Sequence, residues 1–365
     1  MGWLTGWQYR RAITIDRTKV DSDLYNFPVL VALTSSNFNF SKARTDGYDI
    51  RFTSSDGTTL LDYERERHNA SSQVAEYWVR VPLVSSTSDT VIYMYYGKSD
   101  ASDGQNKTGV WDSNFKAVWH LHETAGTHYD STSNNNHGTP YGGVIQGTTA
   151  KIDGGDQFDG SNDYVEIPHA SSLLPNDGSG PGNGSWTISV WMKPPNSSQT
   201  GGLVIKRLDD APYTQYALYI GGPPYTTLPP SKKLTFAYLQ SHPAPRRVAY
   251  TNNDIADGNW HHVVAVANKS LNKAQIYVDG ALASTTDDNY GAWPIINHTR
   301  PVWLGGYFTY YSVLLDEVRL TNGVRSAAWI KAEYHAGNGT LLSVGSEEQQ
   351  TAAAKIPWHL FSMSM

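Results

Sequence analysis

Short apolar segments separated by turn residues recur along almost the whole chain, and helical periodicity is nearly absent. The segment Pro28–Leu33 is one of them, and Ser55-Asp56-Gly57-Thr58 is a turn between two others. Segments of this kind are typical of strands in β-sandwiches. The 32 Gly, 23 Tyr and 12 Trp residues fit this class, because many short strands need many turns and favour aromatic side chains. The sequence therefore predicts an all-β fold of the jelly-roll sandwich type.

The length of 365 residues predicts two such domains in tandem. A Gly- and Asp-rich stretch, residues 97–107, interrupts the strand pattern and looks like a connection. We therefore expect an N-terminal β-sandwich over residues 1–112 and a second one over residues 113–348. One helix is expected in the second domain, over Ser326–Tyr334, with its first residue as the N-cap. The pattern of the second domain ends at Glu348. We expect residues 349–365 to be a disordered or artificially added tail.

Charge and hydropathy narrow the range of partners. The net charge is −6 and no long basic run occurs, so we expect no nucleic-acid partner. No apolar run approaches the roughly 20 residues of a membrane span. The first residues lack the basic and apolar regions of a signal peptide. We expect a secreted or cell-surface protein whose export signal is not part of this sequence.

One set of motifs extends over residues 114–348. The motifs are Phe158–Val165, Trp186–Met192, Asp257–Val263, Gln275–Gly280, Trp303–Gly306 and Leu315–Leu320. In this order they resemble the LamG-like and pentraxin-like branch of the concanavalin A-like sandwiches, and the ordered set is more specific than any single motif. The resemblance implies a sandwich that is used mainly to bind glycans or proteins.

A second set of motifs, over residues 3–112, consists of Tyr9–Arg11, Phe27–Val31, Asp49–Thr53 and Ile92–Gly97. This set resembles the domain of unknown function 2341 family of prokaryotic surface proteins. That family often precedes a LamG-like domain, so each resemblance supports the other. It implies no activity for the first domain.

Calcium is the cofactor that the resemblance implies. LamG-like domains often hold one Ca²⁺ between an oxygen-rich loop and a carboxylate of a late strand, and oxygen donors are what Ca²⁺ prefers. The expected ligands here are Asp130, Asn136 and Asp316. The alternative is an ordinary Asx-rich turn, with a salt bridge from Asp316 to Arg319 or Lys206.

Asp316 and Glu317 are neighbours on one expected strand and should therefore face opposite sides of its sheet. One of them must then lie near the core or the sheet edge. A carboxylate buried there needs a cation or hydrogen bonds.

Exposed aromatic residues are the expected ligand site, because sugars stack on aromatic rings and bond to nearby polar groups. Loops are where such rings are not required by a core. We expect a stacking platform of Trp293, Tyr307 and Tyr310. Its polar partners would be Asp287, Asp288 and Asn289. The alternative is that these rings cover sandwich edges or the interface between the domains.

Catalysis has weaker support. Retaining glycosidases need two carboxylates about 5–5.5 Å apart on one face, and only Glu64 and Glu66 share a strand face in this way. The alternative for this pair is a solvated edge strand that resists aggregation. His261 and His262 could bind a metal or transfer protons, but we favour a packing role. In that role Trp260 would fill the core, and the imidazoles would cap loop carbonyls.

The sequence thus favours a carbohydrate-binding, lectin-like module or a surface adhesin of a prokaryote, with a polysaccharide or glycan as its partner. Two alternatives stay open. One is a polysaccharide hydrolase or lyase on a concanavalin A-like fold. The other is a structural surface or filament protein that binds other surface proteins.

Overall fold

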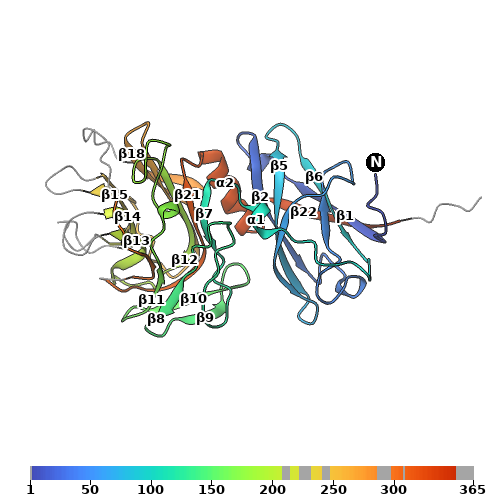
Figure 1. The fold of residues 1–365 in the computed structure, drawn as a ribbon, viewed down its shortest axis with the longest axis horizontal. Helices are drawn as coiled ribbons and strands as arrows, with labels where there is room; N and C mark the ends of the chain where they lie inside the picture. Colours follow the sequence, from blue (N-terminus) through green and yellow to red (C-terminus); the bar gives the residue numbers. More distant parts are fainter. Residues whose placement is uncertain are drawn as a thin grey trace, which may run out of the picture.

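The computed structural model describes residues 2–207, 214–221, 232–240, 247–285, 297–306 and 309–350. Within them the chain forms antiparallel sheets that pack as two β-sandwiches side by side (Figure 1). Each sandwich has its own large core of buried apolar side chains. The predictions of an all-β fold and of two tandem sandwiches are confirmed.

The first sandwich packs a four-stranded sheet, in the order β22-β1-β6-β3, against a three-stranded sheet, in the order β2-β5-β4. Alternate residues of β1, such as Ile13 and Ile15, are fully buried, as the period of two in a strand requires. The strands are β1 (Tyr9–Ile15), β2 (Leu24–Thr34), β3 (Arg51–Thr53), β4 (Tyr63–Asn69), β5 (Val74–Val84), β6 (Thr90–Tyr96) and β22 (Leu342–Gln349).

β22 comes from the far end of the described chain and yet completes the first sandwich. It pairs with β1 along the whole length of that strand, and Arg10 forms an ion pair with Glu348 at 2.7 Å. The range 113–348 expected for the second domain therefore contains a strand of the first. Sequence position did not indicate this, because any strand edge with a matching face can accept a partner from a distant segment. Residues 351–365 of the expected tail lie outside the described part.

The second sandwich packs an eight-stranded sheet against a seven-stranded sheet. The eight-stranded sheet has the order β19-β18-β17-β12-β21-β10-β9, with β7 also paired to β21, and consists of β7 (Phe115–Trp119), β9 (Ile145–Thr149), β10 (Gly154–Asp159), β12 (Trp186–Lys193), β17 (His261–Asn268), β18 (Lys273–Val278), β19 (Ala281–Thr285) and β21 (Ser312–Asn322). The seven-stranded sheet has the order β16-β15-β14-β13-β20-β11-β8 and consists of β8 (Thr139–Tyr141), β11 (Tyr164–Ile167), β13 (Gly201–Arg207), β14 (Thr214–Ile220), β15 (Leu234–Gln240), β16 (Arg247–Tyr250) and β20 (Val302–Leu304).

Two α-helices of the described chain, α1 (Lys107–Val110) and α2 (Ala327–Gly337), lie between the sandwiches (Figure 1). The expected N-cap of α2 is confirmed, because Ser326 Oγ accepts a hydrogen bond from the backbone N–H of Trp329 at 3.2 Å. Trp329 is buried in the core of the first sandwich, whereas Ile330 packs on β17 and β18 of the second. No helix in the described residues is long and apolar enough to cross a membrane.

β21 changes its neighbour halfway along its length. Its first residues pair with β10 and its later residues with β7, and between them Glu317 has a φ of 53°. The register against β12 also shifts here, which marks a β-bulge. Leu315 and Val318 belong to the core, whereas Asp316 and Glu317 are buried at the outer face toward the first sandwich. The prediction that the two carboxylates face opposite sides is wrong, because the bulge adds a residue to the alternation.

Replacement of Trp329 by alanine tests the docking role of α2. Its ring contacts Phe27 edge to face at a centroid distance of 4.7 Å and is buried in the first core. Loss of a buried Trp side chain costs about 3–5 kcal/mol of unfolding free energy. Chemical denaturation should show this loss for Trp329→Ala and almost none for Leu271→Ala, whose side chain is exposed. Equal, small effects of both changes would contradict the packing described for α2.

Candidate functional site

Three tyrosine rings lie together on the face of the seven-stranded sheet opposite the main core. The strands of this sheet are those farther from the first sandwich (Figure 1). Tyr164 on β11 stacks on Tyr141 of β8, with ring centroids 5.1 Å apart and an interplanar angle of 20°. The ring of Tyr310 lies 6.4 Å from that of Tyr164. Tyr141 is 45% exposed, and the other two are half-buried. We call these three residues the tyrosine patch.

A rigid apolar base supports the tyrosine patch. Tyr164 packs against a buried cluster on the same face of the sheet, which consists of Ile205, Ala217, Tyr219 and Trp303. Glu166 accepts a hydrogen bond from the indole N–H of Trp303 at 3.1 Å, so a carboxylate also lies on this face. The patch therefore combines exposed ring surface with a polar group on rigid strands.

Only one of the six predicted ligand residues can be placed. Tyr310 is half-buried and belongs to the tyrosine patch. The others lie outside the described residues; they are Asp287, Asp288, Asn289, Trp293 and Tyr307. Sequence reasoning missed Tyr141 and Tyr164, because it searched loops rather than strands. The alternation around β11 could have revealed Tyr164, since Val165 and Ile167 point into the core and place Tyr164 on the opposite face.

The predicted calcium ligands Asp130 and Asn136 lie together in a closed turn. Asp130 Oδ1 accepts hydrogen bonds from the backbone N–H groups of Val118 (3.0 Å) and Thr132 (2.9 Å). Asp130 Oδ2 accepts from the backbone of Asn136 and from the Thr132 hydroxyl, both at 2.8 Å. The Asn136 amide donates to the Lys116 carbonyl at 2.7 Å. This is the bonding of an Asx-rich turn, the alternative weighed from the sequence.

Asp316 lies elsewhere, at the bulge of β21. Its Oδ2 accepts from the backbone N–H of Ile152 at 2.7 Å, and no contact in the described chain joins it to Asp130. The two expected salt bridges to Asp316 are also absent there. Arg319 instead pairs with two glutamates, and Lys206 donates to a backbone carbonyl. Calcium at this set of residues stays a prediction that these contacts do not support.

A buried cluster of charged side chains joins the two sandwiches at the bulge. His120, directly after β7, lies between Glu317 of β21 and Glu64 of β4, with N–O distances of 2.6 Å and 3.2 Å. Burial opposes the charged imidazole, but the carboxylates around it outweigh burial and raise the pKa of His120 well above its ordinary value. The protonated ring therefore links the two sandwiches.

Glu64 and Glu66 share one face of β4, as the sequence predicts, but this face is not solvated. The two residues are only 5% and 8% exposed, because the second sandwich covers them. Glu64 accepts from the indole N–H of Trp111 at 2.8 Å, and Glu66 accepts from that of Trp78 at 2.6 Å. The interpretation of this pair as part of a solvated edge strand is therefore wrong.

Arg319 completes the cluster from β21. Its guanidinium pairs with Glu317 and with Glu333 of α2, the latter at 2.9 Å, and it lies 4.3 Å from the centroid of the Trp78 ring. Burial would raise the pKa of Glu317, but the charges of His120 and Arg319 outweigh it and lower this pKa to about 2. The cluster is thus a network of paired charges that includes both sandwiches and α2.

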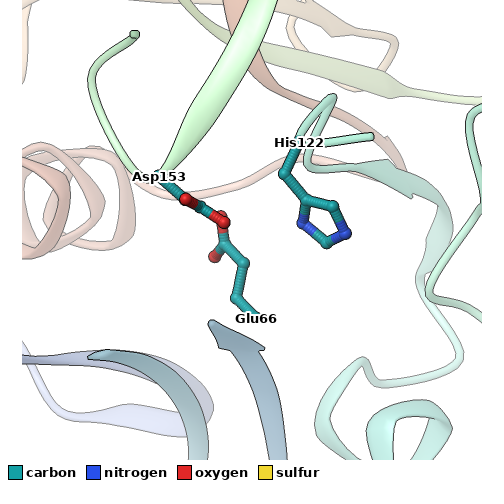
Figure 2. A group of neighbouring side chains, drawn as sticks. All are labelled: Glu66, His122 and Asp153. Atoms are coloured by element: carbon teal, nitrogen blue, oxygen red, sulfur yellow. The ribbon is translucent and has the colours of Figure 1, made fainter. Parts of the chain in front are cut away.

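Two further side chains, His122 and Asp153, meet Glu66 at the edge of this network, as Figure 2 shows. Glu66 comes from β4 of the first sandwich, His122 from the segment after β7, and Asp153 from the segment before β10. One donor atom of each lies within 4.8 Å of the other two, a spacing that can hold a metal ion. The sequence did not predict this group as a metal site. Its residues meet only because β21 exchanges β10 for β7 as its neighbour at the bulge.

A second ion network holds the segment that carries His122. His128 lies between Glu123 and Asp156, with N–O distances of 3.0 Å and 2.9 Å. Burial opposes the charged imidazole, but its interactions with the carboxylates of Asp156 and Glu123, which accept from its N–H groups, outweigh burial and raise the pKa of His128 to about 9. This network ties the segment after β7 to β10.

The histidine pair on β17 has structural contacts. His262 is buried and bonds to Ser189 Oγ at 2.9 Å, and burial lowers its pKa to about 4. His261 lies between Asp257 (3.1 Å) and Asp279 (2.8 Å) near the surface. The imidazoles therefore bond to side chains rather than cap loop carbonyls, and Trp260 is half-buried rather than in the core.

Two family models match the chain, and one of these matches crosses the boundary expected at residue 112. The family model described as the concanavalin A-like lectin/glucanases superfamily matches residues 159–331. The second sandwich is a concanavalin A-like domain. The family described as domain of unknown function (DUF2341) matches residues 46–139. Both resemblances noted in the sequence are thus confirmed. No curated protein sequence matches the chain.

Solved structures that resemble the chain do so distantly. The binding domain of Paraclostridial Mosquitocidal Protein 1 is 13% identical, with a TM-score of 0.47 over 61% of this chain and 52% of that one. The binding domain of botulinum neurotoxin DC, in complex with SialylT, is 11% identical, with a TM-score of 0.45 over 62% and 52%. The match spans about half of each of these chains. These likenesses are too distant to carry an argument about function.

The His128 network predicts how the stability of the concanavalin A-like domain depends on pH. A pKa raised from 6.5 to about 9 stabilises the folded state fully below pH 6.5, and this contribution is lost as the pH rises to about 9. The shift corresponds to about 3 kcal/mol. Denaturant unfolding at pH 6 and pH 9.5 should show a larger fall in stability for the wild type than for His128→Gln. Equal falls in both proteins would contradict the assignment.

Proposed function

We propose that the protein binds a polysaccharide or glycan through the tyrosine patch of its concanavalin A-like domain. The observation that carries this proposal is the stacked pair of the exposed Tyr141 and the half-buried Tyr164, on the sheet face that the first sandwich leaves free. Aromatic rings at a surface offer large contact area at little cost in conformational entropy. Exposed rings grouped in this way are a feature of binding surfaces rather than of an ordinary protein surface.

The arrangement suits a sugar better than an apolar ligand. The apolar face of a pyranose ring can stack on Tyr141 or Tyr310, while hydroxyl groups at its edge need polar partners. Glu166, on the same face of β11 as Tyr164, is such a partner. Because the rings rest on the buried cluster around Trp303, they are held in place before the ligand binds, which lowers the entropic cost of binding.

The family match supports the same proposal, since the superfamily is described by its lectins and glucanases. We place the protein outside the cell, at a prokaryotic cell surface, where a polysaccharide partner would be met. Adhesion to surface glycans, or to other surface proteins that carry them, is the role that follows from this location.

Replacement of Tyr141 by alanine tests the proposal with little risk to the fold, because its ring is exposed. The affinity for the bound polysaccharide should fall about tenfold, which corresponds to ~1.4 kcal/mol. The unfolding free energy should change by no more than about 0.5 kcal/mol. Affinity electrophoresis against a panel of polysaccharides measures the first quantity, and denaturant unfolding measures the second.

Tyr25→Ala is the matched control, since Tyr25 is also an exposed tyrosine but lies on the first sandwich. Its affinity should equal that of the wild type. The proposal fails if no polysaccharide in the panel retards the wild type. It also fails if a bound polysaccharide is held equally well by the wild type, Tyr141→Ala and Tyr310→Ala.

A further inference from the structure

The group Glu66, His122 and Asp153 forms where two segments of the second sandwich diverge. The segment that follows β7 and the segment that precedes β10 separate beside the bulge of β21. Glu66, on β4 of the first sandwich, lies at the same point. In Figure 2 the carboxylates of Glu66 and Asp153 face each other, with the His122 imidazole beside them. Donor atoms of all three residues lie within 4.8 Å of one another.

Polar atoms at this point are buried and lack hydrogen-bond partners. Glu66 Oε1 and His122 Nδ1 are two such atoms, and Oδ1 of the nearby Asp316 is a third. The Glu66 side chain is fully buried, and so is Asp316. An unsatisfied buried polar atom destabilises the folded state, and native proteins contain few of them. Several so close together indicate a missing partner that could serve them all.

The charge of the surroundings shows what kind of partner is missing. Glu66, Asp153 and Asp316 are close to two further buried glutamates, Glu64 and Glu317. His120 and Arg319 already pair with those two glutamates. Arg67 pairs with Asp153 at 2.7 Å and also with Glu76. His120 Nδ1 also lies 3.5 Å from Glu66 Oε2, so three glutamates share one imidazolium, and Asp316 has no ion-pair partner within the described residues. The cluster therefore keeps an excess of negative charge.

A divalent cation at this point would offset the excess of negative charge and bond directly to the free oxygen and nitrogen atoms of Glu66 and His122.

We propose that Glu66, His122 and Asp153 bind a divalent metal ion of the zinc type, which links the two sandwiches. One imidazole nitrogen and two carboxylates are donors typical of Zn²⁺, whereas Ca²⁺ and Mg²⁺ prefer oxygen alone. Asp316 is the buried carboxylate next to this set, and the ion pair with Arg67 orients Asp153.

The neighbouring group Glu66, His120 and Glu317 also has suitable spacing but is not the site. Both ring nitrogens of His120 already have hydrogen-bond partners, since Nδ1 bonds to Glu317 and Nε2 bonds to Glu64. His122 has no such bond at Nδ1, so this nitrogen is free to act as a ligand. The ligands come from both sandwiches, so the ion would stabilise their docking as well as each fold.

Calorimetric titration of Zn²⁺ into protein freed of metal by a chelator tests the proposal. We expect one tight site per chain in the wild type, and at least a hundredfold weaker binding in His122→Ala and in Glu66→Gln. Saturating Zn²⁺ should raise the melting temperature of the wild type by about 3–6 °C, and Ca²⁺ should not. Substitution by Co²⁺ should give a visible absorption spectrum of mixed nitrogen and oxygen ligation in the wild type.

His261→Ala is the matched control, because His261 with Asp257 and Asp279 is the surface group most able to bind Zn²⁺ adventitiously. This variant should keep the tight site. The proposal is overturned if the wild type shows no tight site, or if the site survives in His122→Ala. It is also overturned if the site is lost only in His261→Ala. Glu66→Gln keeps the size of the side chain and so separates loss of a ligand from loss of fold.

Discussion

Buried charge at the bulge of β21 is the constraint on which the arrangement of the two sandwiches depends. Glu317 and Arg319 are held on the outer face of the second sandwich, and His120 joins them to Glu64 of the first. Removing one partner from a buried ion network costs about 3–5 kcal/mol, because it leaves an uncompensated charge. Neither sandwich can therefore turn away from the other without exposing or unpairing these groups.

This constraint divides the surfaces of the concanavalin A-like domain between two roles. Its eight-stranded sheet packs against the first sandwich through the charged cluster and through α2. Its seven-stranded sheet faces away from the first sandwich and carries the tyrosine patch (Figure 1). The first sandwich in turn depends on the end of the chain, because β22 supplies an edge strand beside β1. The two domains are thus interlocked, and a boundary near residue 112 does not separate them.

The fold class could be predicted from local patterns, because alternation, turn residues and an N-cap act over a few residues. Ser326 caps α2 as expected, and both family resemblances hold. The candidate sites were less accessible to this reasoning. Tyr164 was readable from the alternation around β11, but Tyr141 became its partner only through the pairing of β8 with β11. The oxygen-rich turn at Asp130 resembled a metal site in sequence, yet the Asp130 carboxylate already accepts from backbone N–H groups of the turn and of β7.

The sequence by itself determined the all-β class, the two family resemblances and the N-cap of α2. Only the tertiary structure decided which segments meet. Glu66, His122 and Asp153 come from three segments of two sandwiches, and their approach depends on a one-residue bulge at Glu317. A bulge reverses the alternation beyond it, so no local pattern predicts the side on which later residues lie. Contacts between distant segments depend on the packing of whole sheets, and a linear pattern does not contain that information.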